Sequence, residues 1–226
     1  MKTSQDGHIT FNQDAHEYHD IYGKQYQSVT TALKKFFPFE SQEVAEKVST
    51  IPSSIYFGQD VDSILEQWGE SAPCGTGLHE ACEKWINTGE VVTGEHEHGC
   101  RQFAKFFEDL CGREKLLSEQ IVYDERIMIA GTLDILQDEG DGYGLWDIKT
   151  SRVIEQMKLM QYSMQLELYR RFAERNLGCP VRTRGIVWFE GYFRNKQSGF
   201  RILRTIDCQR EVNALIENRK IEIESK

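Results

Sequence analysis

The stretch that decides the fold is AGTLDILQDEGDGYGLWDIKTS, residues 130–151. Two β-rich runs flank the sequence QDEGDG, and Asp-Gly between such runs is a strong signal for a β-hairpin. We therefore predict that residues 133–137 and 143–149 pair as two antiparallel strands, in a hairpin centred between Gly140 and Asp141.

This register places Asp134 directly opposite Asp147, with Cβ atoms about 4.5–5.5 Å apart. Lys149 follows Asp147 by two residues, so it lies on the same face of the strand. The opposite face is predicted to enter the core with Leu133, Ile135, Trp146 and Ile148. Two carboxylates and a lysine are thus expected to converge on one polar patch.

Like charges placed opposite each other destabilise a sheet, and a cation between them removes that cost. Hard oxygen ligands favour Mg²⁺ or Mn²⁺ over zinc. Such a site is typical of metal-assisted phosphodiester hydrolysis, in which a lysine orients water or stabilises developing charge. The alternative is a surface hairpin in which Lys149 only neutralises Asp147, and a one-residue slip of register would favour it.

A long helix over 153–176, capped by Thr150 or Ser151, follows the hairpin. Gln161, Gln165 and Tyr169 recur every four residues and share one face of it. These side chains could hold phosphate oxygens or a base edge beside the hairpin. The alternative is an ordinary solvated helix face, and the same choice applies to the arginines at 170, 171 and 175.

His79 is a further candidate metal ligand, because a neutral imidazole can complete a coordination shell. It is expected near the start of a helix that follows a turn at Gly75 and Gly77 and ends at Gly89. A structural histidine is the alternative. His96 and His98 are interpreted as solvated residues of a charged loop.

The order of predicted elements describes one α/β domain with a central mixed sheet flanked by helices. Short strands and helices precede residue 115. They are followed by strands near 118–124, 126–136 and 143–150, the long helix, two strands on either side of a loop near 194–198, and a last helix near 209–220.

Composition and charge narrow the function further. The 226 residues carry a net charge of −9, but residues 1–150 carry 12 basic and 27 acidic side chains, whereas residues 151–226 carry 15 and 9. A basic C-terminal third is compatible with a local polyanion site. Without an apolar leader, a membrane span or a CxxC pair, we expect a cytoplasmic protein whose six cysteines are mostly free core thiols.

The motifs GTGLH (75–79), GTLD (131–134), DIKTS (147–151) and QLELY (165–169) occur in this order. Together they resemble the RecB-type branch of the PD-(D/E)XK nuclease superfamily. The stretch YGKQYQSVTTALKKFFPFE (22–40) is also similar to the start of phage-borne and mitochondrial genome-maintenance exonucleases. Leu133 stands where the name of the superfamily has Pro, as is common in this branch.

The resemblance implies a single nuclease domain, 1–226, with a restriction-endonuclease-like core at 116–226. Residues 1–115 would form N-terminal strands and a helical roof over the active site. His79, Asp134, Asp147 and the main-chain carbonyl of Ile148 would bind Mg²⁺ or Mn²⁺, with Lys149 as the catalytic lysine. Gln165, Tyr169, Gln161 and Glu119 would contact DNA or support the site. No iron–sulfur cluster is expected, because the cysteine quartet of some relatives is absent.

The expected function is a metal-dependent DNA exonuclease acting on single strands or duplex ends in recombination, repair or replication. A bacterial or phage-infected cytoplasm is its expected setting. A structure-selective endonuclease and a non-catalytic nucleic-acid-binding module of the same fold are the alternatives. A third is a plain α/β domain whose D-x-K sequence is accidental.

Overall fold

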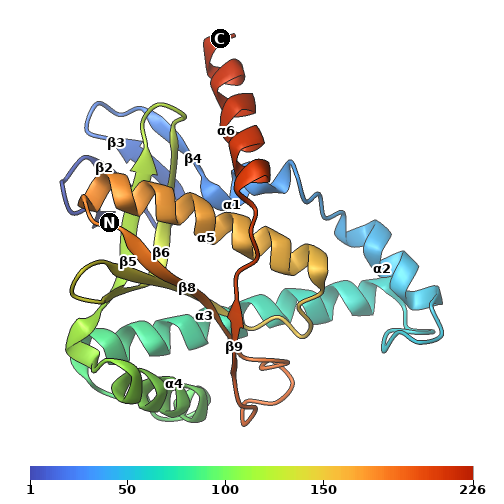
Figure 1. Ribbon diagram of the computed structural model, residues 1–226. Helices are drawn as coiled ribbons and strands as arrows, with labels where there is room; N and C mark the ends of the chain where they lie inside the picture. Colours follow the sequence, from blue (N-terminus) through green and yellow to red (C-terminus); the bar gives the residue numbers. More distant parts are fainter. Residues whose placement is uncertain (226) are drawn as a thin grey trace.

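The computed structural model describes residues 1–225 (Figure 1), so the last residue of the predicted domain lies outside the described part. The strands are β1 (Lys2–Thr3), β2 (Ile9–Asn12), β3 (Glu17–Asp20), β4 (Gln25–Ser28), β5 (Leu116–Asp124), β6 (Ile129–Asp138), β7 (Tyr143–Lys149), β8 (Val181–Trp188) and β9 (Arg201–Arg204). The helices are α1 (Val29–Lys34), α2 (Ser41–Thr50), α3 (Val61–Thr88), α4 (Glu97–Leu110), α5 (Gln156–Leu177) and α6 (Gln209–Glu224), with a 3₁₀ turn at Arg113–Lys115.

The nine strands of the described residues belong to one mixed sheet. β5, β6 and β7 are antiparallel neighbours, β7 pairs parallel with β8, and β9 is antiparallel to β8. Helices cover both faces, so the chain has the α/β architecture with a mixed sheet that the sequence predicts. This arrangement is consistent with a restriction-endonuclease-like fold.

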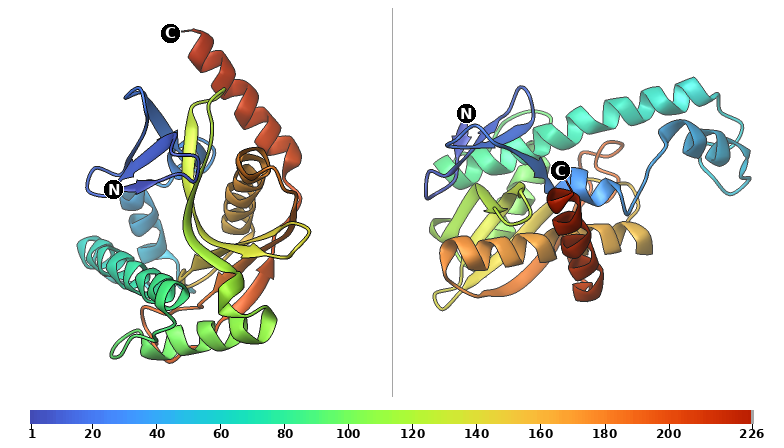
Figure 2. Two further views of the ribbon diagram at one scale, coloured as in Figure 1. Left: turned by 90° about the vertical axis from the view of Figure 1, so that its left-hand side faces the viewer. Right: turned by 90° about the horizontal axis from the view of Figure 1, so that it is seen from above.

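Helices lie on both faces of the sheet (Figures 1 and 2), and two hydrophobic clusters hold them there. α1, α5 and α6 contribute buried residues to a cluster on one face of the sheet. α3 and α4 contribute buried residues to a second cluster on the other face. The catalytic candidates on β6 and β7 therefore lie between two helical layers.

The N-terminal strands extend the same sheet. β4 pairs parallel with the start of β6, through Gln27 with Ile129 and Ser28 with Ala130. Ser28 then begins α1, because its side chain accepts a hydrogen bond from the Thr31 amide, as an N-cap residue does. Ile9, Tyr18 and Tyr26 pack on β5 and β6 in a third cluster. The segment before residue 115 and the segment after it thus share one continuous sheet.

The predicted turn at Gly75 and Gly77 is wrong. α3 is one helix of 28 residues that runs through Pro73 and both glycines without a break. The glycines permit close approach instead. A Cβ at Gly75 would lie 2.8 Å from Thr150 Oγ1, and one at Gly77 would lie 2.3 Å from His96 Nε2. These clashes explain why small residues stand there in a helix that passes close to the end of the β6–β7 hairpin.

Two further predictions need correction. The long helix begins at Gln156 rather than 153, without a side-chain cap from Thr150 or Ser151. Leu133 does not share a face with Ile135, Trp146 and Ile148. It packs in the α5 cluster, whereas those three pack under α3 and α4. The alternation of β6 is therefore interrupted at Asp134, the residue between Leu133 and Ile135.

The remaining predictions concern cysteines and membrane spans. In the described residues the six cysteines are free, and Cys82, Cys100 and Cys208 are buried. Cys74 and Cys111 are half-buried and Cys179 is exposed, so half of the six are core thiols. None of the helices within residues 1–225 is long and apolar enough to cross a membrane.

Candidate active site

Asp134 lies at a gap in the pairing of β6. β4 pairs with β6 up to Ala130, and β7 pairs with β6 from Ile135 onward. The predicted hairpin register is confirmed over Ile135–Asp138, but backbone pairing stops one residue before Asp134 would meet Asp147. There the Ile148 amide donates to Asp134 Oδ2 at 2.7 Å in place of a ladder hydrogen bond. The side chain of Asp134 therefore bridges the two strands where they separate.

Asp147 and Lys149 form a buried ion pair, with Lys149 Nζ 2.6 Å from Asp147 Oδ2. Asp147 is 2% exposed, so the pair does not lie on a surface hairpin, although Lys149 does pair with Asp147 as that alternative describes. Burial raises the pKa of Asp147, the charge of Lys149 opposes that shift, and the charge of Asp134 adds to it. Burial alone would lower the pKa of Lys149, but the charges of Asp147 and Asp134 outweigh it and raise the pKa. Lys149 is therefore a charged ammonium at neutral pH.

Gln165 and Tyr169 on α5 complete the buried side of the site. Gln165 Nε2 donates to Asp147 Oδ1 at 3.3 Å and lies 3.4 Å from the Tyr169 hydroxyl. Both side chains are buried, so the alternative of a solvated helix face is wrong for these two residues. Gln161 lies one turn earlier and is half-buried, and the described contacts do not bring it to the aspartates.

His79 approaches from the opposite side, on α3. Its Nδ1 lies 3.5 Å from Asp134 Oδ2, and its side chain is about a third exposed. The histidine from one helical layer and the glutamine from the other thus converge on the two aspartates between them. His96, in contrast, is not a solvated loop residue. It lies directly before α4, and its ring stacks on the ring of Tyr192.

Glu119 extends the acidic row onto β5. Its neighbours pair as Ser118 with Ile135 and Gln120 with Leu133, so Glu119 lies across from Asp134. Its backbone is left-handed, with φ of 53°, which is costly for a residue with a side chain. Burial raises the pKa of Glu119 to about 7, with a further contribution from the charge of Asp134. Three acidic residues on adjacent strands therefore lie side by side.

The donor chemistry of this row suits a divalent cation. Within residues 1–225 no three His, Cys, Asp or Glu side chains converge closely enough to hold a metal ion as they stand. Asp147 Oδ2 is nevertheless buried without a well-formed hydrogen bond, and Lys149 is the cation that contacts it. Buried carboxylates with raised pKa values are stabilised by a nearby cation. Carboxylate oxygens, an imidazole and a carbonyl match what Mg²⁺ or Mn²⁺ accepts.

Two cationic contacts at this site are not predicted from the sequence. Lys2 on β1 reaches Glu119 and Glu83, across more than a hundred residues of sequence in the first case. Tyr162 on α5 lies under Lys149, with the ammonium 4.9 Å from the ring centroid. The four-residue spacing of His79 and Glu83 indicates that Glu83 lies on the same side of the helix as His79. Nothing in the sequence around Lys2 indicates that this lysine reaches the site.

Comparisons with known proteins point to one kind of relative. No protein-family model matches the chain. Part of the chain is similar to one subunit of the ATP-dependent helicase/nuclease of several bacteria. The protein of Desulforamulus reducens is 38% identical over 68 residues, covering 29% of this chain and 6% of that protein. The Carboxydothermus hydrogenoformans protein is 32% identical over 91 residues, covering 39% and 7%.

A longer and weaker match covers half of this chain. The corresponding helicase/nuclease protein of Bacillus cytotoxicus is 26% identical over 147 residues, covering 50% of this chain and 12% of that protein. The chain therefore matches only a small part of the length of these relatives. A solved structure described as "Crystal structure of SSO0001" is 13% identical and covers 85% of this chain and 83% of its own, with a TM-score of 0.39. That score is too low to support a shared fold.

Proposed function

We propose that this chain is a metal-dependent deoxyribonuclease that hydrolyses phosphodiester bonds, and specifically an exonuclease acting on single-stranded DNA or duplex ends. The observation that carries the proposal is the buried pair of Asp147 and Lys149 beside Asp134 and His79. The partial similarity to helicase/nuclease proteins supports it. Recombination, repair or the processing of replication ends is the corresponding setting.

His79, Asp134, Asp147 and the main-chain carbonyl of Ile148 would hold one Mg²⁺ or Mn²⁺ ion. When bound, the ion supplies a polarised phosphoryl oxygen and a bound water of lowered pKa. Asp147 is held for this role by the Gln165 amide, which fixes one carboxylate oxygen and leaves the other toward Lys149. Asp134 is held by the Ile148 amide.

Lys149 would orient the attacking water or stabilise the charge that develops on the phosphate. The ring of Tyr162 supports its ammonium, and Tyr162 in turn hydrogen-bonds Ser151 at 2.8 Å. The DIKTS segment and α5 therefore hold the lysine from two sides. Basic side chains of residues 151–226 would contact the phosphate backbone of DNA. Binding of this kind weakens steeply as the salt concentration rises.

The first experiment is cleavage of end-labelled DNA, single- and double-stranded, linear and circular, with Mg²⁺, Mn²⁺ or EDTA. We expect metal-dependent degradation of linear DNA that spares circles. Asp147→Asn and Lys149→Met should each lower the rate at least about 100-fold, because each removes a charge that the site directs at the reacting group. Matched controls are Asp141→Asn and Lys105→Met, whose side chains are mostly exposed in surface ion pairs.

The other outcomes decide between the alternatives. Cutting of circular DNA would replace the exonuclease by a structure-selective endonuclease. If wild type and both site variants leave every DNA intact while still binding it, the chain is a binding module and the catalytic proposal is wrong. If the site variants cleave as fast as their controls, the site lies elsewhere.

A further inference from the structure

The two carboxylate oxygens of Asp147 have different partners. Oδ1 accepts a hydrogen bond from the Gln165 amide at 3.3 Å. Oδ2 is buried without a well-formed hydrogen bond, and the Nζ of Lys149 lies 2.6 Å from it. Oδ2 is therefore the oxygen that Asp147 can offer to a bound cation, and it is the same oxygen that faces the ammonium of Lys149.

Lys149 has a second partner within reach, the aromatic ring of Tyr162 on α5. Its Nζ lies 4.9 Å from the centre of that ring, which is the range of a cation–π contact. The side chain of Lys149 is only 18% exposed, so little water solvates its charge. Such a contact is stronger where the cation is poorly solvated. The ammonium can therefore be held by a carboxylate, by an aromatic face, or by both.

The ring of Tyr162 is fixed by contacts that do not involve Asp147. Its hydroxyl shares a 2.8 Å hydrogen bond with the hydroxyl of Ser151. The main-chain carbonyl of Ser151 accepts in turn from the indole of Trp188 on β8, at 2.6 Å. The ring also packs against the hydrophobic cluster that holds α5 on the sheet. Tyr162 is therefore expected to stay in place when Asp147 changes its partner.

We propose that Tyr162 is a positioning residue that holds the ammonium of Lys149 when Asp147 gives Oδ2 to a divalent cation. In the present arrangement Lys149 neutralises Asp147, and with a bound cation the ring would be the partner that remains. The inference rests on the proposed function, because it presupposes an ion held by Asp134 and Asp147. Tyr162 acts through Lys149 in this account and does not itself touch the reacting group.

Charge explains why a second partner is needed. One carboxylate cannot neutralise an ammonium and a divalent cation at the same oxygen, and the two cations repel each other. An ammonium that loses its carboxylate in a buried place is costly to keep charged. The face of an aromatic ring attracts the ammonium, whereas Mg²⁺ and Mn²⁺ take oxygen ligands and do not compete for the ring. Tyr162 thus lowers the cost of metal binding and keeps Lys149 beside the site.

The test is a double-mutant cycle on the dissociation constant of Mn²⁺, measured by calorimetric titration of the full chain at neutral pH. Lys149→Met should bind Mn²⁺ at least about tenfold more tightly than wild type, because it removes a competing cation. Tyr162→Leu should weaken binding about 3- to 30-fold, the value of a cation–π contact. In the Lys149→Met background the same change should have no effect, because no ammonium is left to hold.

Two further variants separate the ring from the rest of the side chain. Tyr162→Phe keeps the aromatic face and loses only the hydrogen bond to Ser151, so its affinity for Mn²⁺ should stay close to that of wild type. Tyr22→Leu is the matched control, since Tyr22 is exposed in the turn between β3 and β4. It should bind Mn²⁺ as wild type does.

Each result has a defined meaning. Equal weakening by Tyr162→Leu in both backgrounds would show a structural role alone and overturn the inference. A Lys149→Met protein that binds Mn²⁺ no more tightly than wild type would overturn it as well, and this comparison does not depend on the folding of Tyr162→Leu. Both results would leave the proposed nuclease intact. No Mn²⁺ bound to wild type would remove the metal-dependent function and with it this inference.

Discussion

At the scale of single residues, the most informative observation is that charge is buried in two places with different consequences. Asp147 is buried with one oxygen in reach of Lys149 alone. Burying a charge that is incompletely paired costs stability. Such an arrangement is expected where a group must remain available for a ligand, as at a catalytic site.

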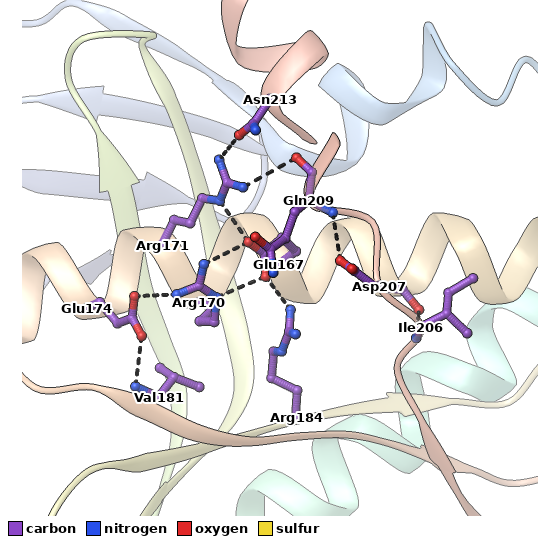
Figure 3. Close-up of polar contacts among 11 residues, drawn as sticks. Glu167, Arg170, Arg171, Glu174, Val181, Arg184, Ile206, Asp207, Gln209 and Asn213 are labelled. Carbon is purple, nitrogen blue, oxygen red and sulfur yellow. Dashed lines mark hydrogen bonds and ion pairs between the residues drawn. The ribbon is translucent and has the colours of Figure 1, made fainter. Parts of the chain in front are cut away.

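Glu167 on α5 shows the opposite case, a buried charge that is fully paired (Figure 3). It is 1% exposed, and Arg170, Arg171 and Arg184 all bind its carboxylate. Arg175 pairs in turn with Asp124. The arginines at 170, 171 and 175, which the sequence offers as phosphate contacts or as a solvated face, are therefore engaged within the protein. Arg171 joins α5 to α6, Arg175 joins α5 to β5, and Arg184 joins β8 to α5.

Glu167→Gln is predicted to lower the free energy of unfolding by roughly 1–3 kcal/mol at neutral pH, because three partly exposed arginines lose their shared partner. Burial alone would raise the pKa of Glu167, but hydrogen bonds from Arg170 and Arg171 and the charges of Arg170 and Arg184 lower it to about 2. The ordinary value is 4.5. The charge therefore stabilises the fold fully above about pH 4.5 and progressively less toward pH 2.

Urea unfolding between neutral pH and about pH 3 measures this effect. The wild type should lose stability over the acidic range faster than Glu167→Gln does. Glu217→Gln is the control, since Glu217 is mostly exposed in a surface pair with Lys220. Parallel pH profiles for wild type and Glu167→Gln would contradict the prediction.

At the scale of elements, β6 is the strand that brings the site together. Along one edge it pairs with β4 and then β7, and along the other with β5. Asp134 lies between the two partners of the first edge, where its carboxylate replaces a backbone acceptor. A hairpin pattern in the sequence predicts the pairing, but it does not predict that the strands separate before Asp134 or that β4 pairs along the same edge of β6.

Gly131 on β6 and Gly69 on α3 provide a test of packing at this scale. A Cβ at Gly131 would lie 2.5 Å from the ring of Tyr169, a buried side chain of α5. Gly131→Ala should therefore destabilise the protein by about 1–3 kcal/mol. A Cβ at Gly69 meets open space within the helix, so Gly69→Ala should stabilise it by about 0.5–1 kcal/mol.

The midpoints of urea unfolding should thus move in opposite directions for these two variants. In Gly131→Ala the displaced Tyr169 ring should also release its hydroxyl from Gln165, so the proposed nuclease activity should fall with stability. A Gly131→Ala protein as stable as wild type would show that Tyr169 can shift without cost.

At the scale of the whole molecule, α2 and the first half of α3 form an arm that extends from the sheet (Figure 2). Ala45 is the buried residue of α2. Aromatic contacts hold the arm together, with Trp68 5.8 Å from both Phe39 and Tyr56 between ring centroids. An element with so few buried contacts is expected to open before the core does.

Trp68→Ala should speed amide hydrogen exchange in α2 roughly tenfold, because it removes two aromatic pairs of about 0.5–1.5 kcal/mol each. Exchange in β6 of the same sample serves as the internal control and should not change. The measurement is hydrogen exchange followed by mass spectrometry. Equal acceleration in α2 and β6 would show that the arm and the core unfold as one unit.

Local pattern determines a large part of this protein. The alternating runs on either side of the Asp-Gly turn define the hairpin and its register, and the four-residue spacing of Gln165 and Tyr169 defines the face of α5 that meets it. These features follow from the regular spacing of side chains along strands and helices. That spacing can be recognised in the order of apolar and polar residues in the sequence. The mixed sheet with helices on both faces follows from the order of the elements.

Tertiary structure alone decided three further features: the continuation of α3 through its glycines, the split of the strands at Asp134 and the place of Lys2 beside Glu119. Each depends on a contact between residues far apart in sequence. The glycines are explained by Thr150 and His96, which lie in other parts of the chain. Periodicity describes what a segment prefers by itself, whereas close approach and ion pairing depend on which segments the fold brings together.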